Sequence, residues 1–152
     1  MLTKEEIVHA IGLHVYWEHE FAQAINDGRY WVHPEIIECD IECALGHWLY
    51  GLSSVEQSSE HFKLVQALHA TFHQEAARVM RLALAGEIAA AQTSLGVGLH
   101  NNLSTALLIA MREWMNTIES PCPAAGKVVP THGIRTPLNP TDPKRSQPGA
   151  NF

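Results

Sequence analysis

The sequence predicts an all-α protein, a four-helix bundle with one short extra helix that carries a Cys-x-Leu-Gly-x-Trp motif. Apolar residues recur at three- and four-residue spacing over long segments, which is the pattern of helices that bury one face. Alternating strand patterns are nearly absent. With 152 residues, 46% of them hydrophobic, the chain is long enough for one domain with a substantial core.

The first helix begins at a capping box and ends at a glycine. Thr3 and Glu6 have the Ser/Thr-x-x-Glu spacing that satisfies the free amides of a first turn. Asp27-Gly28 supplies a residue suited to the left-handed geometry of a helix end. The apolar stripe of this helix includes a histidine and consists of Ile7, Ile11, His14, Phe21 and Ile25.

Two further long helices follow a short central region. His33-Pro34 starts a short helical segment that runs to about residue 42, and Gly46 and Gly51 make residues 43–51 a tight turn or short helix. A long helix is expected over residues 54–85 and a last one over 87–119, with a weak point at Gly96-Val97-Gly98. The buried stripe of the 54–85 helix is expected to be Phe62, Val65, His69, Phe72, Ala76, Val79 and Ala83.

Composition changes after residue 120. Residues 121–152 contain seven of the eight prolines and few apolar clusters, so we expect a disordered tail beyond a bundle of residues 1–120. Residues 1–120 carry six Lys/Arg against fifteen Asp/Glu, a net charge of −9. An acidic body of this kind has no basic face for a phosphate backbone, which argues against nucleic-acid binding.

The chain shows no secretory signal and no apolar run of membrane-spanning length. It has three cysteines, Cys39, Cys43 and Cys122, and this odd, small number does not suggest a disulfide framework. These features predict a cytoplasmic protein without a membrane partner.

The strongest sign of chemistry is the pair His69 and His73. Two residues four apart on a helix share one face, with Cβ atoms about 5–6 Å apart, so both imidazoles can reach one metal ion. Cys43, 26 residues before His69, offers a thiolate, a ligand that favours zinc. His14 lies in the apolar stripe of the first helix, and buried imidazoles need partners for their nitrogens.

Ordinary histidines are the competing interpretation, because the chain has ten of them. His61 lies about 12 Å along the helix axis from His69, too far to share an ion. Cys39 is an alternative to Cys43, and Glu18, one turn after His14, could orient its imidazole. The remaining polar and aromatic candidates are expected at the surface or in the core: His9, His19, His33 and His47 at the surface, and Trp17, Trp31 and Trp114 in the core or at an interface.

Taken together, three motifs resemble the chemoreceptor zinc-binding (CZB) domain family. They are His14-Val-Tyr-Trp17, Cys43-Ala-Leu-Gly-His-Trp48 and His69-Ala-Thr-Phe-His73, and the resemblance extends over about residues 8–118. By that resemblance, the ligands of one Zn²⁺ are His14, Cys43, His69 and His73. Leu45, Gly46 and Trp48 then belong to the structural part of the cysteine motif.

The resemblance implies a cytosolic, commonly homodimeric regulatory domain that controls a chemoreceptor or a diguanylate cyclase pathway according to zinc occupancy. This chain resembles a stand-alone member that acts on a separate signalling partner or simply holds zinc. Some domains of the family sense hypochlorous acid through the zinc–cysteine pair, which makes Cys43 either a redox-reactive group or an inert ligand.

Two other classes of metal protein fit the residues less well. A catalytic zinc keeps a position open for water, whereas four protein ligands close the site. A di-iron bundle of the hemerythrin or ferritin type needs several inward carboxylates at Glu-x-x-His spacing, and Glu6-Ile-Val-His9 is the only such pair. We therefore expect a protein that is not an enzyme.

Overall fold

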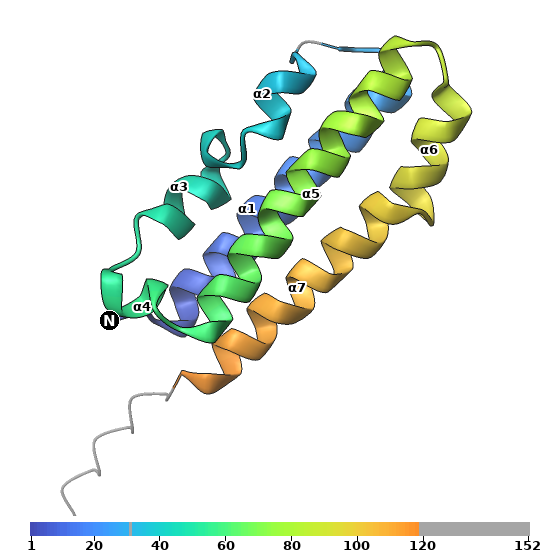
Figure 1. Ribbon diagram of the computed structural model, residues 1–152. Coiled ribbons are helices and arrows are strands. Elements are labelled where there is room, and N and C mark those ends of the chain that lie inside the picture. Colours follow the sequence, from blue (N-terminus) through green and yellow to red (C-terminus); the bar gives the residue numbers. More distant parts are fainter. Residues whose placement is uncertain (31, 119–152) are drawn as a thin grey trace, which may run out of the picture. The chain divides into compact units, whose positions relative to one another are not determined.

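The computed structural model describes residues 1–30 and 32–118, and within these ranges every regular element is a helix. The long helices are α1 (Lys4–Asp27), α5 (Glu60–Leu84) and α7 (Leu99–Thr117) (Figure 1). The all-α prediction is therefore confirmed. The shorter elements are α2 (Pro34–Glu38), the 3₁₀ helix η1 (Asp40–Glu42), α3 (Ala44–Tyr50), α4 (Ser54–Gln57) and α6 (Ile88–Gly96).

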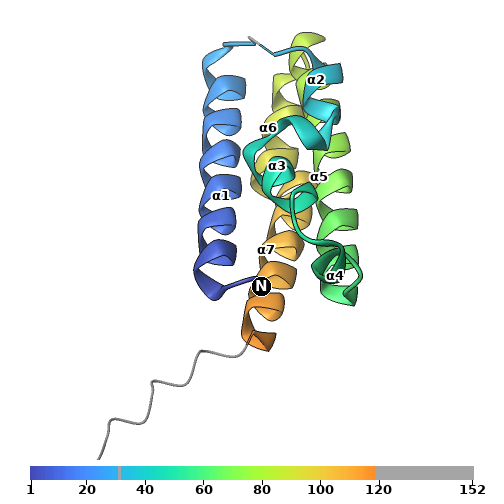
Figure 2. The same ribbon diagram turned by 90° about the vertical axis from the view of Figure 1, so that its left-hand side faces the viewer.

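The helices form a four-cornered bundle. Helix α1 packs against α3, α6 and α7, while α5 packs against α2, α3, α6 and α7. Figure 2 shows α1 and α5 on opposite sides, with the α2–α3 segment in front of them and α6–α7 behind. The fourth corner of the predicted bundle is thus assembled from the short elements α2, η1 and α3.

The predicted ends of α1 are confirmed. The Thr3 side chain accepts a hydrogen bond from the Glu6 amide, and the Glu6 carboxylate accepts one from the Thr3 amide. At the other end, Gly28 has φ of 69°, a left-handed conformation that costs a glycine little.

Two of the helices expected to be continuous are interrupted. The segment expected over residues 54–85 divides into α4 and α5 because Ser59 caps α5, accepting a hydrogen bond from the Phe62 amide. The segment expected over 87–119 divides at its predicted weak point into α6 and α7. A Cβ on Gly98 would lie 2.6 Å from the Ser94 Cα, so only glycine fits this break.

A polar layer divides the core into two apolar clusters. One cluster surrounds Leu45, Leu49 and Met111, and the other surrounds Ile25 and Val79. The predicted stripe of α5 is buried as expected. Between the clusters lie the buried polar residues, which are His14, His69, His73, Glu75, Ser94, His100 and Ser104.

The described residues belong to one compact unit. The expected disordered tail, Cys122 and Trp31 lie outside the described residues. Within the described ranges no helix combines the length and apolarity needed to cross a membrane.

A close backbone contact fixes the cysteine motif. A Cβ on Gly46 would lie 1.9 Å from the Asp40 carbonyl oxygen and 3.1 Å from the Ile41 Cα, both of which are backbone atoms. The first turn of α3 therefore packs directly on η1, and no side chain can be accommodated at residue 46.

We predict that Gly46→Ala destabilises the metal-free domain by about 1–3 kcal/mol, the usual cost of overpacking. Gly12→Ala is the matched control, because nothing lies within 4 Å of its added Cβ in the exposed part of α1. That control should stabilise the domain by about 0.5–1 kcal/mol. Urea unfolding followed by circular dichroism measures both, and equal effects of the two substitutions would contradict the contact.

Candidate metal centre

Cys43 is placed by the helix that it caps. It is the N-cap residue of α3, and its Sγ accepts a hydrogen bond of 3.2 Å from the Gly46 amide. The same sulfur lies 3.2 Å from Nε2 of His69 on α5. The cysteine motif thus brings its sulfur to the surface of α5, at a helix N-terminus that favours a negative charge.

His69 and His73 lie on the buried face of α5, with 0% and 2% of their surfaces exposed. Their rings are 4.6 Å apart, and ligand atoms of His69, His73 and Cys43 all lie within 4.8 Å of one another. The structure therefore brings three of the four predicted ligands together.

A protein oxygen faces Nδ1 in each of these two rings. His73 Nδ1 lies 2.6 Å from the Ile37 carbonyl oxygen, to which only a protonated nitrogen can donate. His69 Nδ1 lies 3.5 Å from the Asp40 carboxylate, a contact longer than a good hydrogen bond. Both contacts direct the proton to Nδ1 and leave the Nε2 lone pair for a metal ion.

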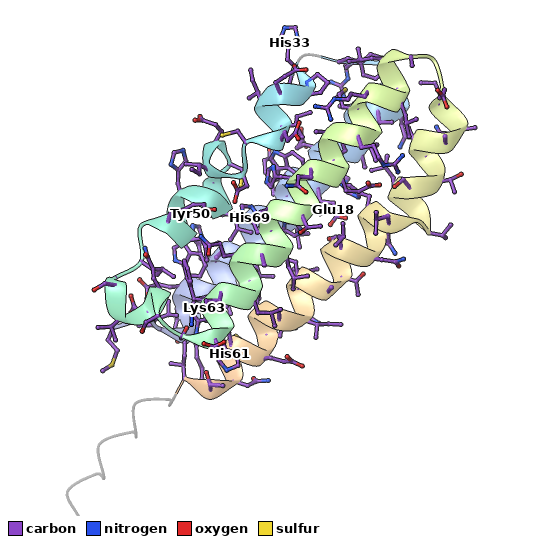
Figure 3. The ribbon with its side chains drawn as sticks, in the orientation of Figure 1. Glu18, His33, Tyr50, His61, Lys63 and His69 are labelled. Carbon is purple, nitrogen blue, oxygen red and sulfur yellow. The ribbon has the colours of Figure 1, made fainter. Side chains whose placement is uncertain are left out.

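Asp40 is a site residue that the sequence analysis missed. Its carboxylate accepts a hydrogen bond of 2.7 Å from the Tyr50 hydroxyl and faces His69. Figure 3 labels Tyr50 on α3 and His69 on α5, the two residues that this carboxylate contacts. The spacing of helical residues gives no sign of this arrangement, because Asp40 lies in the 3₁₀ helix η1.

His14 lies near the other three but is not part of their group. Its Nε2 is 3.1 Å from the Ser104 hydroxyl on α7 and 4.0 Å from the Glu18 carboxylate. The side chain, 2% exposed, also borders a cavity of about 180 Å³ that Cys43 and His73 line. His14 therefore lies across a small cavity from the Cys43 and His73 side chains.

Burial keeps the imidazoles neutral. Desolvation, with the charges of neighbouring histidines, lowers the pKa of His14 to about 3, and desolvation followed by the His73 charge lowers the pKa of His69 to about 4. Desolvation also lowers the pKa of His73, against the opposing effect of the Ile37 carbonyl. At neutral pH all three rings are in the form that binds metal ions.

Burial also favours the neutral form of the Cys43 thiol, but for a thiol this means a raised pKa. Burial raises the pKa of Cys43, and the amides of Gly46 and Leu45 oppose this shift only in part. Without a metal ion the sulfur is therefore a neutral thiol at pH 7.

The donor set fits zinc. Tetrahedral zinc with Zn–S near 2.3 Å and Zn–N near 2.0–2.1 Å separates its ligand atoms by about 3.3–3.6 Å. The 3.2 Å between Cys43 Sγ and His69 Nε2 is close to that separation. One thiolate and neutral imidazoles would hold the ion with a net charge of about +1.

The other candidates are placed apart from this group. Cys39 is exposed, as are His9, His19, His33 and His47, and His61 is half-buried. Trp114 is in the core, as expected. Glu18, labelled in Figure 3, reaches His14 through Ser104.

His100 is the buried histidine that the sequence analysis overlooked. It is fully buried in α7, where its ring lies 4.7 Å from Phe72 and 5.6 Å from Phe21. Neither ring nitrogen has a hydrogen-bond partner among the described residues. Its spacing from Ser104, Leu107 and Met111 continues the buried stripe of α7, and that regularity was the available signal.

Comparison with known proteins places these residues in a family. The model of the chemoreceptor zinc-binding domain matches residues 14–80, which begin at His14 and include Cys43, His69 and His73. No curated protein and no solved structure gives a match. The match is narrower than the expected residues 8–118 and leaves α6 and α7 outside it. Residues 14–80 therefore carry the match to the chemoreceptor zinc-binding (CZB) domain family, and this match, together with the group of Cys43, His69 and His73, supports Zn²⁺ as the cofactor.

Proposed function

We propose that this chain is a zinc-responsive regulatory domain that binds one Zn²⁺ through His14, Cys43, His69 and His73. The observation that carries the proposal is the group formed by Cys43, His69 and His73, whose ligand atoms lie within 4.8 Å of one another. Zinc in such a site links helices distant in sequence, so zinc occupancy and helix packing depend on each other.

His14 is the fourth ligand in this proposal. Its support is the cavity of about 180 Å³ that His14 shares with Cys43 and His73. In this proposal a short movement of the His14 ring into the cavity brings it to Cys43 and His73 and closes the site. Because His14 is on α1, closure joins α1 to α5 and to the cysteine motif.

A closed site suits regulation better than catalysis. Four protein ligands leave no position for a reactive water, which a catalytic zinc requires. The family and the absence of a spanning helix in the described residues support a cytoplasmic domain that acts on a signalling partner. Helix α1 also exposes apolar side chains that offer a surface for a homodimer, namely Val8, Val15 and Tyr16.

Oxidation of Cys43 is a second candidate signal. Cys43 and His73 line an apolar cavity of about 360 Å³ that also touches the exposed Cys39, which gives small oxidants a route to the sulfur. Zinc binding converts the thiol to the thiolate, the form that attacks oxidants. Hypochlorous acid would transfer its oxygen to this sulfur, giving a sulfenic acid and chloride.

We predict one zinc per wild-type chain and a large loss of affinity in Cys43→Ser, His69→Ala, His73→Ala and His14→Ala. Each loss should exceed the roughly 10–100-fold cost of removing an outer hydrogen-bond partner. His61→Ala and Cys39→Ser are matched controls that keep the wild-type affinity. Competition titration with a chelating dye gives the affinities, and native mass spectrometry gives zinc and chain stoichiometry. A wild-type chain without tight zinc binding would overturn the proposal.

We also predict that zinc binding at pH 7 releases about one proton, from the Cys43 thiol. The thiol is protonated in the metal-free chain because its pKa is raised, whereas the imidazoles are already neutral because their pKa values are lowered. Affinity should therefore rise about tenfold per pH unit between roughly pH 5 and 8. Calorimetry in buffers of different ionisation enthalpy counts the protons, and release that persists in Cys43→Ser would contradict this assignment.

For the redox candidate we predict that mild hypochlorous acid modifies Cys43 and releases zinc. Residues 30–63 form one tryptic peptide that contains Cys39 and Cys43. Cys39→Ser therefore isolates the modification of Cys43 in peptide mass spectrometry and should still lose zinc. Unmodified Cys43 with retained zinc would reject oxidant sensing and leave zinc sensing intact.

A further inference from the structure

The nitrogen of His14 that lies farther from its backbone is directed toward α7. Its Nε2 lies 3.1 Å from the Ser104 hydroxyl, and that hydroxyl donates a hydrogen bond of 2.7 Å to Glu18 Oε2. A serine hydroxyl has one proton to donate. Since Ser104 gives that proton to Glu18, it must accept from His14, which places the ring proton of His14 on Nε2.

The hydrogen bond between His14 and Ser104 is shielded from water, because both side chains are buried. His14 is 2% and Ser104 3% exposed, and the Glu18 side chain is 25% exposed. In such surroundings a hydrogen bond ending on a carboxylate is stronger than a neutral one. The Nε2–H tautomer of His14 is therefore strongly favoured, and its lone pair is on Nδ1.

The two histidines of α5 have the opposite arrangement. His73 donates from Nδ1 to the Ile37 carbonyl, and His69 Nδ1 faces the Asp40 carboxylate. Their lone pairs are on Nε2. In all three cases a ring nitrogen faces the surrounding protein, which is how metal-binding histidines are oriented.

We infer that His14 binds the metal ion through Nδ1, whereas His69 and His73 bind through Nε2, and that Ser104 and Glu18 are positioning residues for His14. This inference rests on the proposed function. Ser104 lies on α7, outside the residues 14–80 that match the family, so the assignment concerns a helix that the family match does not include.

The arrangement links zinc occupancy to α7. A metal-bound imidazole carries more positive charge, so its Nε2–H donates more strongly to Ser104 and through it to the Glu18 carboxylate. The other carboxylate oxygen of Glu18 lies 3.9 Å from His100 Nδ1, also on α7. The zinc-loaded domain therefore holds α1 and α7 together more tightly than the metal-free domain does.

Nuclear magnetic resonance of the zinc-loaded wild-type chain tests the tautomers directly. Long-range ¹H–¹⁵N correlation of the imidazoles should show the proton on Nε2 of His14 and on Nδ1 of His69 and His73. A proton on Nδ1 of zinc-bound His14 would overturn the inference while leaving the proposed function intact. A wild-type chain that takes up no zinc would overturn both.

Substitutions test the positioning role. Ser104→Ala and Glu18→Gln should each weaken zinc binding about 10–100-fold. In a His14→Ala background neither should weaken it further, because the ring that they orient is gone. Equal losses with and without His14 would show a merely structural role and overturn the assignment.

Ser94→Ala is the matched control for these substitutions. Ser94 is also a buried serine, 5% exposed, that donates a hydrogen bond of 2.7 Å to a glutamate, in its case Glu75. It should leave zinc affinity unchanged. Thermal unfolding of each metal-free variant separates loss of folding from loss of binding, and hydrogen exchange at α7 should slow on zinc addition in the wild type but not in Ser104→Ala.

Discussion

The three buried histidines near Cys43 each have two ring nitrogens to be matched with partners, and this constraint organises their part of the polar layer. A buried polar atom without a partner costs about 1–3 kcal/mol, so two free nitrogens on each of several rings would be a heavy cost for one domain. The protein places an oxygen atom next to one nitrogen of each ring near Cys43. The Ile37 carbonyl faces His73, the Asp40 carboxylate faces His69 and the Ser104 hydroxyl faces His14. On the proposed function, one cation accepts the remaining lone pairs of these three rings.

The same constraint explains why the short elements matter more than their length suggests. Ile37 in α2, Asp40 in η1 and Cys43 at the start of α3 all contact α5 histidines. The absence of a side chain on Gly46 brings α3 and η1 close enough for these contacts to coexist. In a continuous helix over residues 34–50 the Ile37 carbonyl would accept a hydrogen bond from the Ile41 amide, so the interruption at Cys39 leaves this carbonyl available to His73.

The sequence was sufficient for whatever depends on helical spacing. His69 and His73 share a face because they are four apart, and Phe62, Val65 and Val79 are buried because they continue that face. The contacts that protein oxygens make with the histidine rings could not be predicted in this way. Asp40 and the Ile37 carbonyl lie in short elements whose path has no period, and Ser104 meets His14 only after the helices pack. His100 could have been predicted from the stripe of α7, but no motif drew attention to it.

On the proposed function, the placement of the donors favours a site that responds to zinc over one that is permanently filled. Cys43, His69 and His73 come from two neighbouring corners of the bundle, which pack directly on each other through α2, α3 and α5. His14 comes from the corner diagonal to α5, and its Nε2 is held by α7. Three of the proposed donors are therefore assembled without the ion, and in the proposal the fourth, His14, joins them as α1 adjusts. On the proposed function, the free energy of adding that last ligand is expressed in the packing of α1 and α7. A site built only on α5 and the cysteine motif would take no ligand from α1.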